Sequence, residues 1–371
     1  MVDDEGRIVD VTPPPAPSQG GHTAEKYEGI IVPGFVNTHC HLELSHLKGE
    51  VSEKKGLAGF ISELVPKRGQ FSEEKIKAAV ISADEEMYCD GVVAVGDISN
   101  TDHSFDQKKK SKILYHTFIE VFDLVSEKAN EKLAEAKALS LKLETLNSSI
   151  VPHAPYSVSG KLMELIDGLK QPILSVHNQE TASENELFLS GSGALAEMMK
   201  KSGVDVDAKS REKSPLLFIL GRVMESGKIL LVHNTYTSKT DVELMKQYIE
   251  VSGFQVALCL CPNANLYIEN KLPDVPMFLE HGMKLTLGTD SYASNWTLSI
   301  LDEMKILSKH FPKIPFETLI ALATRNGAEF LGMDKELGTI EKGKKPGLNL
   351  LKGIDPEKMQ LTDRAEVQKL V

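Results

Sequence analysis

The chain has 371 residues, 41% of them hydrophobic and 26% charged, a composition typical of a globular enzyme long enough for one barrel of about 250 residues. Its formal net charge is −11, and no basic stripe stands out beyond Lys108-Lys109-Lys110, which is interpreted as a solvated loop, so nucleic-acid binding is disfavoured. No signal peptide and no bilayer-spanning apolar run is recognised, and the four cysteines lack disulfide-framework spacing, which predicts a cytoplasmic protein with no membrane partner.

The first residues contain a strand-like piece, Gly6–Val11, and then a turn-rich stretch with four prolines, Thr12–Gly21. Beyond them, short β-branched or apolar runs alternate with longer helical patterns, which predicts a parallel sheet with crossover helices. Eight strands are expected, at Ile30–His39, Val92–Ser99, Ile113–Val121, Ser149–Tyr156, Ile173–Asn178, Ile229–Asn234, Phe254–Leu260 and Lys284–Asp290.

Amphipathic stretches lie between most of these strands and predict helices. The clearest are Glu74–Met87, Glu131–Leu146, Leu162–Leu169 and Asp241–Tyr248. Eight parallel strands joined by helices predict a (β/α)₈ TIM barrel over residues 31–334. The tail holds a short helix and then the strand-like Leu348–Leu351, which is expected to pair with the N-terminal strand. Residues 1–30 and 335–371 are therefore expected to form a small β-sandwich subdomain.

Polar residues fall at the ends of the expected strands. In a (β/α)₈ barrel the C-terminal ends of all strands converge on one mouth, where active sites are built. The period of His39-Cys40-His41 is that of a strand, so both imidazoles project from one face and can bind one ion. Histidines with a carboxylate are typical of zinc sites that keep a position for water. The strand-end residues are His39, His41, His153, His177, His233 and Asp290.

Several segments carry a resemblance to the amidohydrolase superfamily. Pro33–Leu42 resembles its first-strand signature, and His177–Glu180 is similar to the HxxE motif of its deaminases. The subgroup indicated is the chlorohydrolase and cytosine-deaminase-like one, which includes S-adenosylhomocysteine, guanine and aminodeoxyfutalosine deaminases. Further segments that resemble this subgroup are Cys261–Asn265, Leu287–Ser291, Ala293–Asn295 and Ala323–Ala328. Because few residues precede the first barrel strand, the N-terminal part of the family's sandwich is expected to be truncated.

The resemblance implies one divalent metal ion, most simply Zn²⁺, with Fe²⁺ or Mn²⁺ as alternatives. A bound Zn²⁺ lowers the pKa of its water from 15.7 to about 7, and Asp290 can accept the proton of that water. No lysine ends the fourth expected strand, which argues against a binuclear centre, although Glu120 could in principle bridge two metals. The implied roles are metal binding by His39, His41, His177 and Asp290, proton transfer by Glu180 and water orientation by His233.

Alternatives remain open for three of these residues. Glu180 could be a solvent-exposed residue near the start of a helix, where the helix dipole favours a carboxylate. His233 is followed by residues that depart from the family pattern, so a structural role is open. His153 could contact substrate or serve only the structure.

The segment His41–Leu47 resembles the HxHLExS variant of aminodeoxyfutalosine-type deaminases, which makes Glu43 and Ser45 candidates for substrate binding together with His153. Glu43 could instead pair with a nearby lysine. The expected activity is hydrolytic deamination of a purine-like or nucleoside-like heterocyclic amine, with release of ammonia. The rival functions are hydrolysis of another C–N or C–Cl bond by an amidohydrolase or chlorohydrolase, and ligand binding by a degenerate member. A homodimer is the default oligomer.

Overall fold

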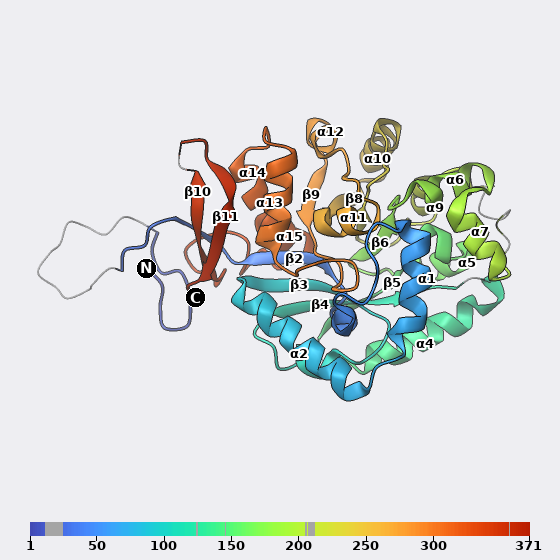
Figure 1. Ribbon diagram of the computed structural model, residues 1–371, viewed down its shortest axis with the longest axis horizontal. Coiled ribbons are helices and arrows are strands. Elements are labelled where there is room, and N and C mark those ends of the chain that lie inside the picture. The colour runs from blue at the N-terminus through green and yellow to red at the C-terminus, as the bar shows by residue number, and fades with distance from the viewer. Residues whose placement is uncertain (12–24, 124, 145, 205, 207–211, 356) are drawn as a thin grey trace, which may run out of the picture.

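The computed structural model describes residues 1–11, 25–123, 125–144, 146–204, 206, 212–355 and 357–371. Eight parallel strands in this part of the chain form two four-stranded sheets, with the orders β2-β3-β4-β5 and β6-β7-β8-β9 (Figure 1). The strands are β2 (Phe35–Cys40), β3 (Val92–Ser99), β4 (Leu114–Val121), β5 (Asn147–Pro152), β6 (Leu174–Asn178), β7 (Lys228–His233), β8 (Gln255–Leu260) and β9 (Lys284–Leu287).

Backbone hydrogen bonds join the two sheets at both seams. At one seam the N–H of His177, on β6, donates to the carbonyl oxygen of His153, just beyond β5, at 2.9 Å. At the other seam the N–H of Asp290 donates to the carbonyl oxygen of His39 at 3.0 Å, and Cys40 and Asp290 form a parallel bridge. The predicted (β/α)₈ barrel is therefore confirmed.

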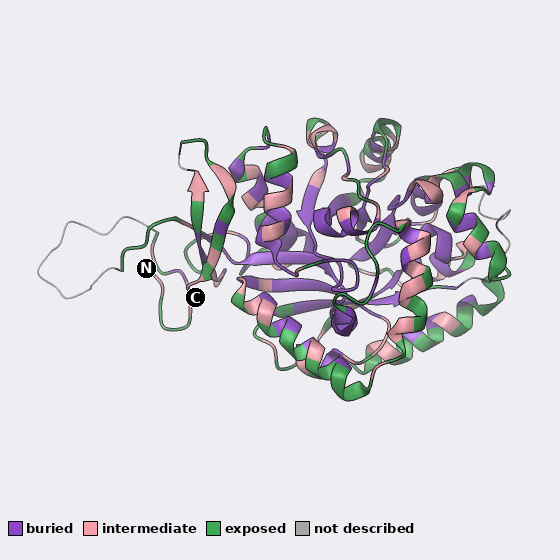
Figure 2. Ribbon diagram, viewed as in Figure 1, coloured by how far each residue is buried: buried purple, intermediate pink, exposed green. Residues whose placement is uncertain are grey.

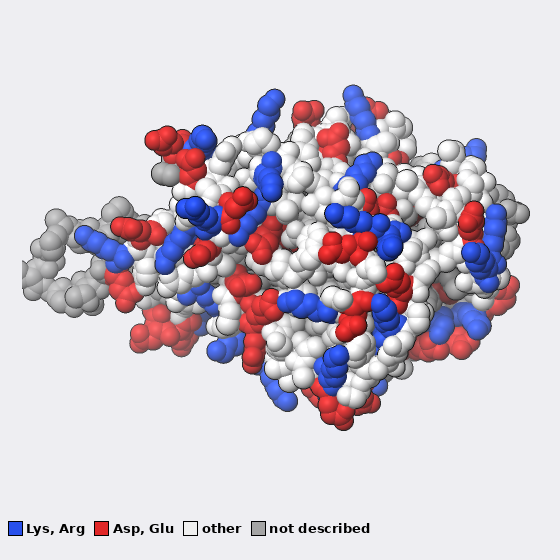
Figure 3. Space-filling view, viewed as in Figure 1, with Lys and Arg blue, Asp and Glu red and all other residues white. Residues whose placement is uncertain are grey.

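The barrel strands are apolar because helices cover the sheet and side chains fill the interior. On β7, for example, the four residues Ile229–Val232 are completely buried, and only Lys228 at the strand start reaches solvent. Figure 2 shows buried residues along the strands and exposed residues on the outer faces of the helices. On the face seen in Figure 3, acidic and basic side chains are interspersed.

Helices surround the barrel, and the four amphipathic stretches correspond to α2, α4, α5 and α10. No helix in the described parts of the chain combines the length and apolarity needed to cross a bilayer. The short 3₁₀ helices are η1 (Leu42–Leu47), η2 (Ser126–Lys128) and η3 (Pro155–Ser157). The α-helices are α1 (Gly56–Arg68), α2 (Glu73–Cys89), α3 (Phe105–Lys108), α4 (Ala129–Leu141), α5 (Gly160–Asp167), α6 (Ala182–Ser190), α7 (Gly193–Lys201), α9 (Pro215–Leu220), α10 (Lys239–Ser252), α11 (Pro262–Ile268), α12 (Val275–Glu280), α13 (Ile300–His310), α14 (Phe316–Ala323) and α15 (Arg325–Leu331).

The first expected strand, Ile30–His39, is in fact two strands in different sheets. Its first part, β1 (Ile30–Pro33), belongs to a small antiparallel sheet, and its second part is β2 of the barrel. Gly34 separates them at a very close approach, because a Cβ there would lie 2.3 Å from Val93 Cγ1. The prediction of one continuous strand is wrong because this crowded turn depends on residues distant in sequence.

The small sheet has the order β1-β10-β11, with β10 at Leu348–Asp355 and β11 at Gln360–Lys369, and it lies beside the barrel (Figure 1). The expected pairing of Gly6–Val11 with the tail strand is wrong. The N–H of Ile8 donates instead to the carbonyl oxygen of Lys344 at 2.9 Å, while β10 takes β1 and β11 as its neighbours. The turn-rich stretch Thr12–Gly21 lies outside the described residues.

The interpretation of Lys108-Lys109-Lys110 as a solvated loop is wrong for Lys108. Its side chain is fully buried at the end of α3, and its Nζ lies 2.5 Å from Oδ2 of the equally buried Asp97 on β3. Lys109 and Lys110, the next two residues, are exposed as expected. The short helix thus turns one lysine of the run inward, where a buried carboxylate neutralises it.

Candidate active site

The mouth of the barrel brings the predicted strand-end residues together. Imidazole ring centroids lie 4.8 Å apart for His39 and His177, 4.8 Å for His153 and His177, and 5.4 Å for His177 and His233. The ring of His41 lies 4.9 Å from that of His39. Four barrel strands and the segments that follow them therefore converge on one polar cluster.

Three ligand atoms have the spacing that a single divalent ion requires. His39 Nε2 and His41 Nε2 lie 3.2 Å apart, and Oδ1 of Asp290 lies 3.3 Å from His41 Nε2 and 3.7 Å from His39 Nε2. Two ligands each about 2.1 Å from a zinc ion, at a tetrahedral angle, are about 3.4 Å apart. These residues therefore fit one metal ion.

His177 supplies a third imidazole to this cluster. Its Nδ1 bonds to the carbonyl oxygen of His153 at 2.9 Å, which leaves Nε2 as its free ring nitrogen. Candidate ligand nitrogens of His39, His41 and His177 all lie within 4.8 Å of one another. Burial, followed by the neighbouring histidines, lowers the pKa of His177 well below its ordinary value, and burial does the same for His41. Both imidazoles are therefore neutral, as metal binding requires.

Asp290 is held in its charged form by the cluster. Although burial opposes the charge, the neighbouring imidazoles, first that of His39 and then those of His41 and His233, hold the pKa of Asp290 well below its usual range. The hydroxyl of Ser294 donates to Oδ2 of Asp290 at 2.6 Å, while Oδ1 faces His39 and His41. The carboxylate is thus ionised and fixed in orientation.

Left-handed backbone conformations cluster in the same region. The φ angles are 46° at Gln179, 71° at His233, 56° at Asn234 and 58° at Asp290. Such conformations cost on the order of 1–3 kcal/mol each in residues other than glycine, and they persist where surrounding contacts enforce them. Each of these residues is, or is next to, a predicted site residue, so part of the backbone strain lies at the strand ends around the cluster.

Glu180 is buried beside His233 rather than exposed at a helix start. Its side chain is 7% exposed, and its Oε1 lies 3.6 Å from His233 Nε2. Burial, together with the charge of Asp290, raises the pKa of Glu180 well above its usual value. This shift favours the protonated carboxyl group, which is the form that can deliver a proton. The alternative of a solvent-exposed carboxylate is wrong.

His153 lies at the edge of the cluster with one nitrogen occupied. Its Nδ1 is 2.6 Å from Oγ of Ser157, so Nε2 is the nitrogen left for another partner. The rings of Tyr156 and Phe122 lie 5.6 Å and 6.3 Å from the His153 ring. Burial lowers the pKa of His153 to about 4, which makes it a neutral hydrogen-bonding group.

The side chains of Glu43 and Ser45 interact with other residues of the protein. The carboxylate of Glu43 forms an ion pair with Arg68 and accepts hydrogen bonds from the N–H and hydroxyl of Thr101, at 2.9 Å and 2.7 Å. Its charged partner is thus an arginine and not the lysine considered from the sequence. The hydroxyl of Ser45 donates to the carbonyl oxygen of Leu42 at 2.7 Å. Their use in substrate binding stays a prediction.

Glu120, near the end of strand β4, lies against the candidate metal ligand His177. Its Oε1 is 3.5 Å from Nδ1 of His177, and burial raises its pKa to about 7. Glu120, His153 and His177 form a second group of possible ligands within 4.8 Å of one another. The side-chain amide of Asn100 donates to the other carboxylate oxygen of Glu120 at 3.0 Å. Glu120 therefore lies next to His177, and its use as a metal ligand stays a prediction.

Two residues that contact the site had been given no role from the sequence. Ser294 bonds Asp290, and Oδ1 of Asn265 lies 3.3 Å from Nδ1 of His233. Both lie in segments that carry the family resemblance, so the signal was present in the sequence. Their roles emerge only when the fold places them against residues far along the chain.

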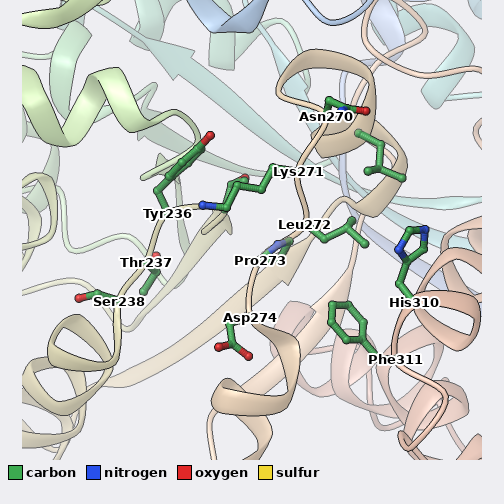
Figure 4. Close-up of a pocket in the computed structure, with 12 residues that line it drawn as sticks. Tyr236, Thr237, Ser238, Asn270, Lys271, Leu272, Pro273, Asp274, His310 and Phe311 are labelled. Carbon is green, nitrogen blue, oxygen red and sulfur yellow. The ribbon is translucent and has the colours of Figure 1, made fainter.

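A separate cavity of about 690 Å³ lies beside the loop that follows β7 (Figure 4). Lys271 lies 3.8 Å from the ring centroid of Tyr236 on one side, and His310 and Phe311 line the other. None of the predicted site residues lines this cavity. It is therefore distinct from the histidine cluster.

Comparisons with known proteins indicate the family and agree with the barrel fold. A family model described as the amidohydrolase family matches residues 30–371. A 5-methylthioadenosine/S-adenosylhomocysteine deaminase from Halalkalibacterium halodurans is 28% identical over 361 residues, which cover 91% of this chain and 75% of that protein. The structure of Helicobacter pylori aminofutalosine deaminase in complex with methylthio-coformycin matches with a TM-score of 0.71 at 24% identity, covering 86% of this chain and 78% of that one. An atrazine chlorohydrolase from Arthrobacter aurescens, complexed with zinc, gives a TM-score of 0.70 at 16% identity and covers 91% and 81%.

Proposed function

The chain belongs to the amidohydrolase family, and on that basis we propose that it is a metal-dependent hydrolase that deaminates purine-like or nucleoside-like amines. The observation that carries the proposal is one buried cluster of three imidazoles and an ionised carboxylate, with Glu180, whose pKa is raised by burial, beside it. Two of the named relatives are deaminases, one of 5-methylthioadenosine and S-adenosylhomocysteine and one of aminofutalosine, which supports the same reaction type here.

In this proposal His39, His41, His177 and Asp290 hold one divalent metal ion. The separations among His39, His41 and Asp290 support this set, as does the free Nε2 of His177. When bound, such an ion supplies water whose pKa falls from 15.7 to about 7. Zinc is proposed because a structural neighbour is complexed with it, and iron or manganese are the alternatives.

Glu180 is proposed to protonate a ring nitrogen of the substrate, which makes the adjacent ring carbon electrophilic. Its raised pKa favours the protonated form that this step needs. Asp290, which is ionised, accepts a proton from the attacking water and passes it to the departing amino group. As ammonia leaves, the hydroxyl proton of the tetrahedral adduct returns to Glu180 and the ring carbonyl forms, so the net change is addition of water and loss of ammonia.

His233 and His153 are proposed to position the reactants. Nε2 of His233 lies 3.6 Å from Glu180 and can hold the attacking water between that carboxyl group and Asp290. His153 offers Nε2 to the heterocycle, since Ser157 occupies Nδ1. An aminodeoxyfutalosine-type nucleoside is the proposed substrate, supported by the Helicobacter pylori neighbour and the HxHLExS-like segment.

The direct test is a screen for ammonia release by zinc-loaded protein from amino-purines, adenosine derivatives, pterins and cytosine. The expected result is turnover of adenosine-type nucleosides, with Glu180→Gln as the inactive control. Failure to release ammonia from every amine would contradict the proposal.

Hydrolysis of a carbon–chlorine bond is the second candidate, because the atrazine chlorohydrolase has the same fold. Water activated at the same cluster could displace chloride from an aromatic ring without any change of ligands. Chloride release from atrazine, without ammonia release from any nucleoside, would favour this function.

A further inference from the structure

Asn265 contacts His233 from the first turn of α11, and both side chains are buried. Oδ1 of Asn265 lies 3.3 Å from Nδ1 of His233. The amide nitrogen of Asn265 donates to the hydroxyl oxygen of Thr235, two residues after His233. The asparagine amide is therefore held at both of its ends.

The orientation of this amide indicates which nitrogen of His233 carries the proton. In the structure the amide nitrogen faces Thr235 and the carbonyl oxygen of Asn265, which can only accept a hydrogen bond, faces His233. In this orientation Nδ1 of His233 is the donor. A neutral imidazole with its proton on Nδ1 has a lone pair on Nε2.

The surroundings of Nε2 of His233 leave this nitrogen able to accept a hydrogen bond from a bound molecule. It is buried, lacks a hydrogen-bond partner among the described residues, and lies 3.6 Å from Oε1 of Glu180. The backbone of His233 and Asn234 is held in left-handed conformations, and the side-chain amide of Asn234 is bonded to the carbonyl oxygen of Leu231 at 2.8 Å. The imidazole is thus fixed in place as well as in tautomer.

We propose that Asn265 is a positioning residue that holds His233 in the Nδ1–H tautomer, so that Nε2 accepts a hydrogen bond from the attacking water. The inference rests on the proposed function for the step that uses this water. The tautomer itself does not depend on which amine is the substrate. Orienting partners of this kind change activity by about 10- to 100-fold when they are removed.

The first test reads the tautomer directly in zinc-loaded protein labelled with ¹⁵N in its histidines. Two-bond ¹H–¹⁵N spectra separate protonated from unprotonated ring nitrogens, and the His233 signals are identified by their absence in His233→Gln. The expected result is a protonated Nδ1 and an unprotonated Nε2 at neutral pH. A protonated Nε2 would overturn the proposal, even if deamination were demonstrated.

The second test uses Asn265→Leu, which keeps the approximate volume but removes the acceptor. We expect kcat to fall about 10- to 100-fold, with KM and zinc content essentially unchanged and the fixed tautomer lost. Thr235→Val, which removes only the outer bond to Asn265, should give a smaller loss of kcat. Full activity in Asn265→Leu would overturn the positioning role. If no amine is turned over while the tautomer is as expected, the proposed function fails and the tautomer assignment stands.

Discussion

Asp97 links the buried Lys108 to the backbone beside the predicted metal ligand His41. One oxygen of the Asp97 carboxylate lies 2.5 Å from Lys108 Nζ, and the other accepts the N–H of Leu42, the residue after His41, at 2.7 Å. The hydroxyl of Ser99 also accepts a hydrogen bond from Lys108 at 2.9 Å. A completely buried ion pair thus supports the segment that carries the histidine pair.

Replacing Lys108 by Met should destabilise the protein by about 3–5 kcal/mol, because it leaves the carboxylate of Asp97 buried without its partner. Urea unfolding followed by circular dichroism measures the change. The matched control is Lys109→Met, whose exposed side chain should alter stability by no more than about 0.5 kcal/mol. Equal losses in the two variants would show that the ion pair contributes nothing specific.

Glu180→Gln should reduce turnover by about 10²- to 10⁴-fold while metal content stays near one ion per chain. The amide has nearly the same shape, so the metal site should remain intact. Because the amide cannot deliver a proton, protonation of the substrate ring nitrogen should be lost. Steady-state ammonia release and elemental analysis give the two readouts. Glu186→Gln, at an exposed position on α6, the helix that begins just after Glu180, is the control and should be fully active. Wild-type turnover in Glu180→Gln would remove this residue from the mechanism.

Asp290→Asn should abolish activity and greatly weaken zinc binding, because a neutral amide replaces the only carboxylate proposed as a ligand. Ser294→Ala should have a graded effect, since it removes only the hydroxyl that fixes Oδ2 of Asp290. Loss of such an orienting bond weakens metal affinity by about 10- to 100-fold, and competition with a chelator measures it. Unaltered zinc affinity in Asp290→Asn would exclude this carboxylate from the site.

Because His116 is buried in its neutral form, we expect the folded protein to lose stability in acid. Burial lowers its pKa from the ordinary 6.5 to about 4, so the unfolded chain binds a proton in this range before the folded one does. Stability contributed by the neutral, buried ring is present above pH 6.5 and is lost as the pH falls toward 4, by up to about 3 kcal/mol.

The pH effect is measured as the change in the free energy of unfolding between neutral pH and pH 4.5, compared between the wild type and His116→Gln. The variant should lose less stability over this interval, because the group that titrates has been removed. His310→Gln changes an exposed histidine and should keep the wild-type pH dependence. If the free energy of unfolding changes equally with pH in all three proteins, His116 is not the source of the acid effect.

The barrel and the family resemblance were readable from the sequence because their signals are local, and both are confirmed. The run Ile229–Val232 is apolar at every position, as a strand covered on both sides must be. His177 falls at the end of such a run, and strand ends in this fold converge. The ligand and catalytic roles themselves stay predictions.

The errors arose where the structure depends on partners far along the chain. Gly34 divides two strands because Val93 crowds it, and no local pattern marks that contact. Strand β11 was not predicted, because its residues are mostly polar and its position depends on pairing with β10. Lys108 was assigned to solvent with its neighbours, because nothing in the run shows that Asp97 lies beneath it.

The central claim is that His39, His41, His177 and Asp290 hold a single metal ion, and anomalous diffraction from crystals of zinc-loaded protein tests it most directly. Data collected on both sides of the zinc absorption edge locate zinc without assumptions about its ligands. The predicted result is one peak per chain, within about 2.0–2.3 Å of a nitrogen of each histidine and an oxygen of Asp290. A peak bound instead by Glu120 and His153, or no peak at this cluster, would contradict the claim.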